Sequence, residues 1–112
     1  MQAAILLVGE YQPLLDTRAQ LLWDCEVSTV DARGAPGALR ERLYDLLIFC
    51  HSVPDSTAGA LIALATKLHP DIKVLALFYD GEQRRLGTTT FTSDFYNPEL
   101  LREAVGRMLS AV

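Results

Sequence analysis

The sequence has too few cysteines, too little positive charge and too short apolar runs for several classes of protein. Two cysteines among 112 residues do not make a disulfide framework. Ten lysines and arginines face fourteen aspartates and glutamates, so the net charge is −4, and nucleic-acid binding, which needs clustered basic side chains, is not expected. The first apolar run ends at Gly9, too early for a signal peptide or for a membrane span of about 20 residues. We expect a cytoplasmic protein that binds neither nucleic acid nor membrane.

What the sequence does contain is typical of one globular domain. Half of its residues are apolar, 21% are charged and 8% are aromatic, which excludes a disordered or low-complexity chain. At roughly 150 residues per domain, 112 residues predict a single unit that spans residues 1–112. A chain of this length can bury a core without disulfides or metals.

Short apolar segments alternate with helical patterns along the whole chain. Continuously apolar runs such as AAILLV (Ala3–Val8) are typical of strands that are buried on both faces of a sheet. The strands are predicted at Ala3–Val8, Glu26–Val30, Asp45–Cys50, Lys73–Phe78 and Thr88–Thr92. The helices are predicted at Pro13–Trp23, at Ala38–Leu43, from a cap at Asp55 or Ser56 to about His69, and from Pro98 after a cap at Asn97.

Two further features of the helical segments follow from composition. The glycines and proline of Asp31–Gly37 predict a loop before the second helix. Apolar residues spaced three or four apart predict the buried stripe of each longer helix. These stripes are Leu15, Ala19 and Leu22; Ala58, Leu61, Ile62, Ala65 and Leu68; and Leu101, Val105, Met108 and Val112.

The alternation of strands and helices predicts an α/β fold with helices on both faces of a parallel sheet. Five strands in this length, joined by right-handed crossovers, favour a flavodoxin-like three-layer sandwich with strand order 2-1-3-4-5. Ligands of such folds bind beyond the carboxyl ends of the strands. The loops at that end are Gly9–Gln12, Cys50–Ser56, Phe78–Gly81 and Thr92–Asn97.

Four segments beside these loops carry a family pattern. They are ILLVGEY (Ile5–Tyr11), YDLLIFCHSVP (Tyr44–Pro54), HPDIKVLALF (His69–Phe78) and FTSDFYNPELL (Phe91–Leu101). Together they resemble the first, third, fourth and fifth strands of response-regulator receiver domains in the CheY-like superfamily. The resemblance covers nearly the whole chain, and it implies a signal-transduction domain of a two-component or phosphorelay system.

The residues that carry a receiver's chemistry differ from the family pattern. The resemblance places Cys50 at the phosphoaccepting aspartate, and it places Gly9 and Glu10 at the acidic pair that holds Mg²⁺. Phosphoryl transfer needs a carboxylate nucleophile and cations that neutralise the spreading charge, and Mg²⁺ prefers oxygen ligands. We therefore expect a degenerate receiver that has no Mg²⁺, no other cofactor and no enzymatic activity. Asp55 is the nearest substitute carboxylate.

The positions of the family's switch also differ. Phe78 stands at the switch threonine or serine and Asp94 at the lysine, whereas Phe91 fits the switch aromatic. Phe78 has no hydroxyl that a phosphoryl group would pull inward, and it can simply pack on Phe91. Asp80–Leu86 is several residues too short for a receiver's full fourth helix, so partner binding on that surface would differ in shape.

Cys50 has two interpretations, an inert and partly buried thiol or a reactive one. Reactive thiols need nearby cations or a helix N-terminus, whereas the expected neighbours of Cys50 are the acids Glu10 and Asp94. These two acids are either a site for a cation or a partner's basic side chain, or two solvated carboxylates that diverge.

The other cysteine and the histidines do not extend the site. A disulfide between Cys25 and Cys50 is not expected, because the two residues lie at opposite sheet ends on strands that are not adjacent. Cys50, His51 and His69 do not have the spacing of a metal site.

Two functions follow from this pattern. The first is a pseudo-receiver, a phosphorylation-independent protein-interaction module that docks on another signalling protein or forms a homodimer. The alternative is a receiver-fold sensor that responds to oxidation of Cys50 or to a small ligand beside the two acids. An enzyme of flavodoxin-like fold is disfavoured, because no glycine-rich phosphate loop or nucleophile–base pair is present. Tyr11, Tyr79 and Tyr96 would form an aromatic rim for a partner or fill the space of the lost ion site.

Overall fold

Strands and helices alternate in the structure as the sequence pattern predicts. The computed structural model describes residues 2–78, 90–93 and 98–110. The strands are β1 (Ala4–Val8), β2 (Glu26–Val30), β3 (Leu46–Phe49), β4 (Lys73–Phe78) and β5 (Thr90–Ser93). The helices are α1 (Gln12–Leu21), α2 (Ala35–Glu41), α3 (Asp55–Leu68) and α4 (Pro98–Ser110). Of the helices in this described part, none is long and apolar enough to cross a membrane.

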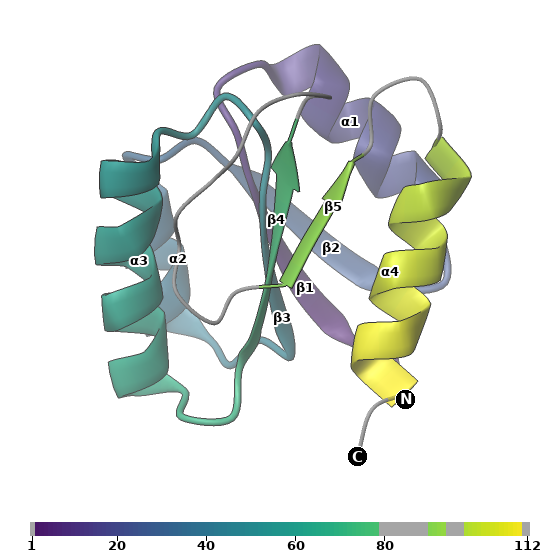
Figure 1. The fold of residues 1–112 in the computed structure, drawn as a ribbon. Helices are drawn as coiled ribbons and strands as arrows, with labels where there is room; N and C mark the ends of the chain where they lie inside the picture. Colours follow the sequence, from purple (N-terminus) through teal and green to yellow (C-terminus); the bar gives the residue numbers. More distant parts are fainter. Residues whose placement is uncertain (1, 79–89, 94–97, 111–112) are drawn as a thin grey trace.

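The strands form one parallel sheet in the order β2-β1-β3-β4-β5 (Figure 1). Strand β1 pairs with β2 on one side and with β3 on the other. This arrangement confirms the predicted order of the first four strands, and β5 lies beside β4. The segment Asp80–Leu86, predicted to be too short for a full fourth helix, and the predicted cap at Asn97 lie outside the described residues.

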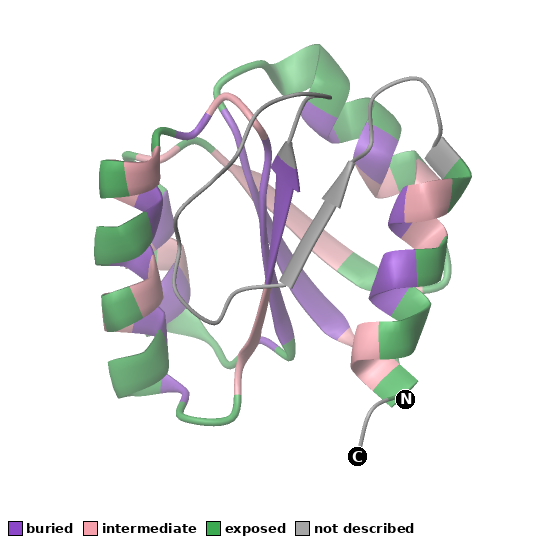
Figure 2. Cartoon of the chain, in the orientation of Figure 1, coloured by how far each residue is buried: buried purple, intermediate pink, exposed green. Residues whose placement is uncertain are grey.

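Helices cover both faces of the sheet (Figure 1): α1 and α4 pack on one face, α2 and α3 on the other. Because side chains alternate along a strand, successive residues of β1 enter different cores. Leu6 and Val8 lie in the core beneath α2 and α3, whereas Ile5 and Leu7 lie in the core beneath α1 and α4. Every residue of β1 and β3 is buried, which explains why both strands are continuously apolar (Figure 2).

The alternation along β3 decides where Cys50 lies. Ile48 belongs to the core beneath α1 and α4, and Cys50, two residues further on, belongs to the same core. On the opposite side of this core, α1 buries Leu15 and Arg18, which are three residues apart and therefore share one face of the helix. The fold thus turns Cys50 towards α1.

The second helix differs from the prediction at both ends. It spans Ala35–Glu41, so the predicted loop at Asp31–Gly37 is wrong beyond Gly34. Pro36 lies in the first turn, where the missing N–H of a proline has no partner to lose. The Asp31 carboxylate accepts a hydrogen bond from the Gly34 N–H at 2.8 Å and fixes the turn that leads into the helix.

The third helix also differs at its ends. Its N-cap is Pro54 and makes no side-chain cap, so the predicted cap by a polar side chain is wrong. Asp55 instead lies in the first turn, where a negative charge is favourable to the helix dipole. Leu68, predicted to be buried, is 38% exposed, whereas His69 is buried. The His69 ring explains this exchange, because its Nε2 donates to the Leu39 carbonyl at 2.8 Å.

Candidate functional site

The candidate site lies at the carboxyl ends of β1 and β3, which are neighbours in the sheet (Figure 1). The register pairs Val8 with Phe49, and the Cys50 N–H donates to the Val8 carbonyl at 2.9 Å. Gly9 and Cys50 therefore follow the last paired residues of adjacent strands. The structure thus brings together two of the positions at which the sequence departs from the receiver pattern.

Gly9 is packed closely against two buried side chains, so that a side chain at this position would require them to move. A Cβ atom added to Gly9 would lie 2.9 Å from Leu15 Cδ2 and 3.1 Å from both Cβ and Sγ of Cys50. Leu15 is 1% exposed and Cys50 is 2% exposed, so neither can turn into solvent to make space. A side chain at the place of the family's first acid would therefore crowd the core beneath α1.

Cys50 contacts a buried arginine that the sequence did not indicate as a site residue. The Arg18 guanidinium donates a hydrogen bond from Nη1 to Cys50 Sγ at 3.2 Å. Arg18 is 8% exposed. The predicted surroundings of Cys50 named only the acids Glu10 and Asp94, and the structure adds a cation that touches the sulfur. The sequence contains one sign of this contact, because Arg18 lies between the buried residues Leu15 and Leu22 on the side of α1 that faces the core.

Glu10, the acid that remains from the pair, is exposed and bonds to the backbone of a neighbouring loop. Its carboxylate accepts a hydrogen bond from the Ala32 N–H at 3.1 Å. The Glu10 N–H in turn donates to the Ser52 hydroxyl at 3.1 Å, which joins the loops that follow β1 and β3. The carboxylate therefore steadies the segment between β2 and α2.

A cavity of about 270 Å³ adjoins the Arg18–Cys50 contact. Gly9 and Ser52 line it, and so do both members of the contact. Tyr11, which also lines the cavity, is 60% exposed. The cleft thus has a small opening that leads to a thiol and a guanidinium.

Several predicted site residues cannot be compared with the structure. The backbone register places Phe78 opposite Ser93 and Phe91 opposite Ala76, so the two aromatic residues lie on adjacent strands, two residues out of register. Their predicted packing falls outside what is described of those residues. Asp94, Tyr79 and Tyr96 lie outside the described residues.

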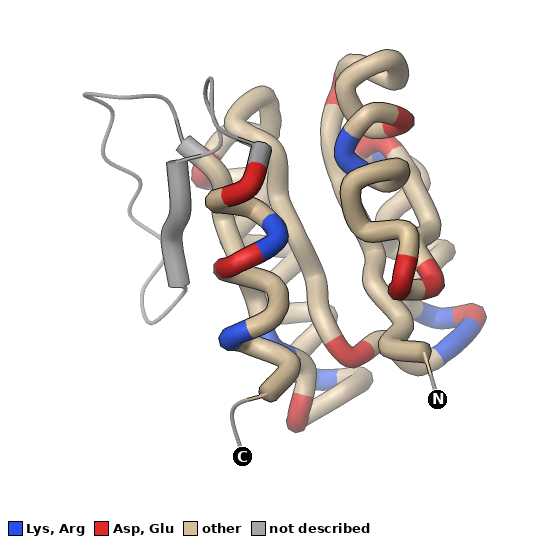
Figure 3. Tube along the Cα trace, turned by 90° about the vertical axis from the view of Figure 1, so that its right-hand side faces the viewer, with Lys and Arg blue, Asp and Glu red and all other residues tan. Residues whose placement is uncertain are grey.

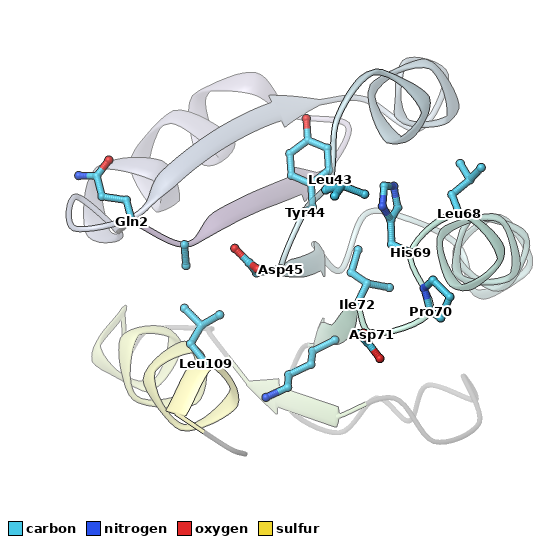
Figure 4. A pocket seen from close by; sticks show the side chains of 12 residues that line it. Gln2, Leu43, Tyr44, Asp45, Leu68, His69, Pro70, Asp71, Ile72 and Leu109 are labelled. Carbon is cyan, nitrogen blue, oxygen red and sulfur yellow. The ribbon is translucent and has the colours of Figure 1, made fainter.

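A larger cavity, of about 610 Å³, lies at the opposite end of the sheet (Figure 4). Several of its polar side chains already hold the chain together. The Asp45 carboxylate accepts a hydrogen bond from the Ala4 N–H at 2.8 Å, and the Lys73 ammonium group donates to the Met108 carbonyl. His69 is held through Nε2 as described above, while its buried Nδ1 has no hydrogen-bond partner among the described residues. These bonds indicate a structural role for this end of the sheet.

The side of the molecule formed by α1 and α4 carries mixed charges and an exposed aromatic residue. Acidic and basic positions alternate along it rather than gathering by sign (Figure 3). Arg102 pairs with Asp24 at 3.2 Å, and its guanidinium lies 5.5 Å from the centre of the Trp23 ring. Trp23 itself is 74% exposed.

The cysteines and histidines do not form a disulfide or a recognisable metal site. Cys25 and Cys50 are not joined by a disulfide in the structure. Within the described ranges, no three residues of the His, Cys, Asp or Glu type are grouped as a metal would require.

No protein-family model and no curated protein sequence matches the chain, but solved structures do. The chemotaxis response regulator CheY4 of Vibrio cholerae is 20% identical, with a TM-score of 0.81 over 96% of this chain and 99% of that chain. The receiver domain of the sensor histidine kinase PA1611 from Pseudomonas aeruginosa PAO1 is 15% identical, with a TM-score of 0.79 over 99% and 100%. The BeF3-activated DrrB receiver domain is 19% identical, with a TM-score of 0.77 over 97% and 98%. This chain has the receiver-domain fold.

The receiver fold accounts for the position of the candidate site, at the carboxyl ends of β1 and β3. At these identities the likeness concerns the fold, so the chemistry has to be argued from the residues of this chain. In this receiver fold, Gly9 lacks a side chain and Cys50 carries sulfur where a carboxylate would supply oxygen. The cleft holds a thiol and a guanidinium, which is a different chemical set from a magnesium-binding group of carboxylates.

Proposed function

We propose that this chain is a receiver-type signalling module whose contacts with other proteins do not depend on phosphorylation. The packing of Gly9 carries the proposal: an added Cβ would lie 2.9 Å from Leu15 and 3.1 Å from Cys50. An aspartate at this position would need more room than a single methyl group. The core therefore opposes the carboxylate that would complete a magnesium site.

The chemistry of Cys50 supports the same conclusion. Mg²⁺ takes oxygen ligands in near-octahedral geometry, and a thiol is a soft ligand that suits other metals. Phosphoryl transfer in receivers also uses a carboxylate oxygen as the acceptor, which Cys50 lacks. Glu10 does supply a carboxylate, but its oxygen accepts a hydrogen bond from Ala32. A single carboxylate that already accepts a hydrogen bond would bind a divalent cation only weakly.

The test is a two-dimensional NMR titration of the labelled protein with Mg²⁺ and then with beryllofluoride. We expect no saturable shifts at Gly9, Glu10 or Cys50 at millimolar Mg²⁺, and no further change with beryllofluoride. The DrrB receiver domain, solved in its BeF3-activated form, is the matched positive control. Saturable shifts at these residues would refute the proposal, and so would a stable phosphoryl group on Asp55 after treatment with acetyl phosphate.

A variant separates the loss of the acceptor from the loss of the metal site. Cys50→Asp restores a carboxylate at the end of β3 but leaves Gly9 without a side chain. We expect Cys50→Asp to remain unphosphorylated by acetyl phosphate, as measured by intact-protein mass spectrometry. Phosphorylation of this variant would show that Gly9 is no barrier and that Cys50 alone blocks the reaction.

The partner is proposed to be another signalling protein or a second copy of the chain. The exposed rings of Tyr11 and Trp23 support a role in protein contacts, since Tyr and Trp are enriched at interfaces. Light scattering over a concentration series distinguishes self-association from a monomer. If a dimer forms through these rings, Trp23→Ser weakens it, whereas a surface change on the far side of the sheet, such as Lys67→Ser on α3, leaves it unchanged.

A further inference from the structure

We propose that the Arg18–Cys50 pair is a modification site at which the Cys50 thiolate is oxidised to a sulfenic acid by hydrogen peroxide or a small hydroperoxide. The inference rests on the proposed function, because it gives the phosphorylation-independent module an input at the same cleft. The inference and the proposed function are tested by different measurements, since peroxide chemistry needs neither Mg²⁺ nor a carboxylate.

The contact between Arg18 and Cys50 supplies the condition that a reactive thiol needs. A guanidinium stays protonated in proteins, so a permanent cation lies 3.2 Å from Cys50 Sγ. Both side chains are more than nine-tenths buried, and water screens their interaction little. Burial alone favours the neutral thiol, and a cation in contact with the sulfur opposes that effect by stabilising the thiolate, which is the nucleophilic form.

The cavity beside Cys50 supplies access for a small oxidant. Its volume of about 270 Å³ exceeds the roughly 30 Å³ that one water occupies in the liquid, so it has room for a peroxide molecule. Ser52 and His51 line the same cavity and offer polar atoms that can bind the oxygens of a peroxide. At 2% exposure, Cys50 is closed to larger thiol reagents. The site therefore selects oxidants by size.

The reaction balances with the named oxidant. The sulfur of the thiolate attacks one oxygen of the peroxide, the S–O bond forms and the O–O bond breaks. Hydroxide leaves from hydrogen peroxide and becomes water on taking up a proton. The sulfur loses two electrons and the peroxide gains them. The product places an oxygen on Cys50, and the Arg18 guanidinium can donate to it as it donates to sulfur.

Cys25 serves as an internal control, because exposure favours oxidation of Cys25 whereas contact with a guanidinium favours oxidation of Cys50. Cys25 is partly exposed, whereas Cys50 is buried. Partial burial raises the pKa of Cys25, the Asp24 carboxylate raises it further, and Arg102 acts in the opposite direction. If exposure governs oxidation, Cys25 reacts first. If the cation governs it, Cys50 reacts first.

The experiment treats the reduced protein with limiting hydrogen peroxide near neutral pH, traps sulfenic acid with dimedone after mild unfolding, and quantifies each cysteine by peptide mass spectrometry. We expect Cys50 to be modified at least about tenfold faster than Cys25, equivalent to one pKa unit of thiolate character. Equal rates, or faster modification of Cys25, would overturn the proposal in favour of an inert Cys50.

Two variants test the role of the cation. Arg18→Gln removes the charge and should slow oxidation of Cys50 by about tenfold, whereas Arg18→Lys keeps the charge and should retain most of the rate. An unchanged rate in folded Arg18→Gln would overturn the proposal.

A measurement on the unaltered protein covers the case in which Arg18→Gln does not fold. A thiolate that already exists at neutral pH reacts at a nearly constant rate between about pH 6.5 and 8, whereas an ordinary thiol gains almost tenfold per pH unit. A rate that climbs in proportion to hydroxide would therefore contradict a stabilised thiolate. Cys50→Ser, which has no thiol, identifies the modified peptide.

Discussion

The close packing of Gly9 makes a single methyl group an informative perturbation. Gly9→Ala adds a Cβ atom 2.9 Å from Leu15 Cδ2 and 3.1 Å from Cys50 Cβ. Contacts of this length force neighbours to move, and Leu15 and Cys50 are both almost fully buried. Overpacking a well-packed core costs about 1–3 kcal/mol, and we expect Gly9→Ala to lose stability in that range.

Glycine substitutions elsewhere in the chain should act in the opposite direction. A Cβ added to Gly59 in α3 meets nothing within 4 Å. Glycine within a helix is about 0.5–1 kcal/mol less favourable than alanine, so Gly59→Ala should stabilise the protein by that amount. The matched pair therefore predicts opposite signs for the same chemical change.

The assay is urea unfolding of both variants and the parent, monitored by tryptophan fluorescence and circular dichroism. A double variant locates the strain: Gly9→Ala should cost less free energy in a Leu15→Ala background, because the nearest clashing atom is gone. If the free energy of unfolding of Gly9→Ala lies within about 0.5 kcal/mol of that of the parent, as is typical of substitutions at uncrowded surface positions, the cleft has room for a side chain. The argument against a first acid would then fail.

Two further outcomes are expected from polar contacts. Arg42 donates a hydrogen bond to the Glu26 carboxylate at 2.6 Å, and this bond lowers the pKa of Glu26. Because the folded-state pKa is the lower one, the contribution to stability is present above glutamate's ordinary pKa and is lost as the pH falls through the lowered value. Carboxyl NMR titration of Arg42→Gln should show the Glu26 pKa rising towards its ordinary value, and an unchanged pKa would contradict this cause. Separately, His69→Leu leaves the Leu39 carbonyl without its donor and should cost about 1–3 kcal/mol in urea unfolding; a smaller loss would mean that water replaces the ring.

Most of the fold could be predicted because its signals are local. The continuous apolar run of β1 predicts a strand that is covered on both faces, and every residue of β1 is buried. The errors occurred where two local rules compete. The sequence pattern predicts a loop at Pro36, yet Pro36 occupies a first helical turn. The predicted apolar stripe includes Leu68, which is the last residue of its helix.

The candidate site was predictable in part for the same reason. Gly9 and Cys50 each follow a strand, so their departure from the receiver pattern can be read along the chain. The contact between Arg18 and Cys50 joins residues 32 positions apart on different elements. The residue pattern within either segment gives no information about a contact between the two segments. A charged residue on an otherwise apolar helix face was the one local sign of it.

The sequence by itself determined the alternation of strands and helices, the order of at least four parallel strands, and the absence of a receiver's carboxylates from two positions of the cleft. These are properties of residue type and spacing, and they follow from propensity, burial and handedness. Only the tertiary structure shows that Leu15 and Cys50 crowd Gly9 and that a guanidinium touches the Cys50 sulfur. Both depend on how closely α1 packs on the sheet, a distance that is set by the whole core rather than by any one segment.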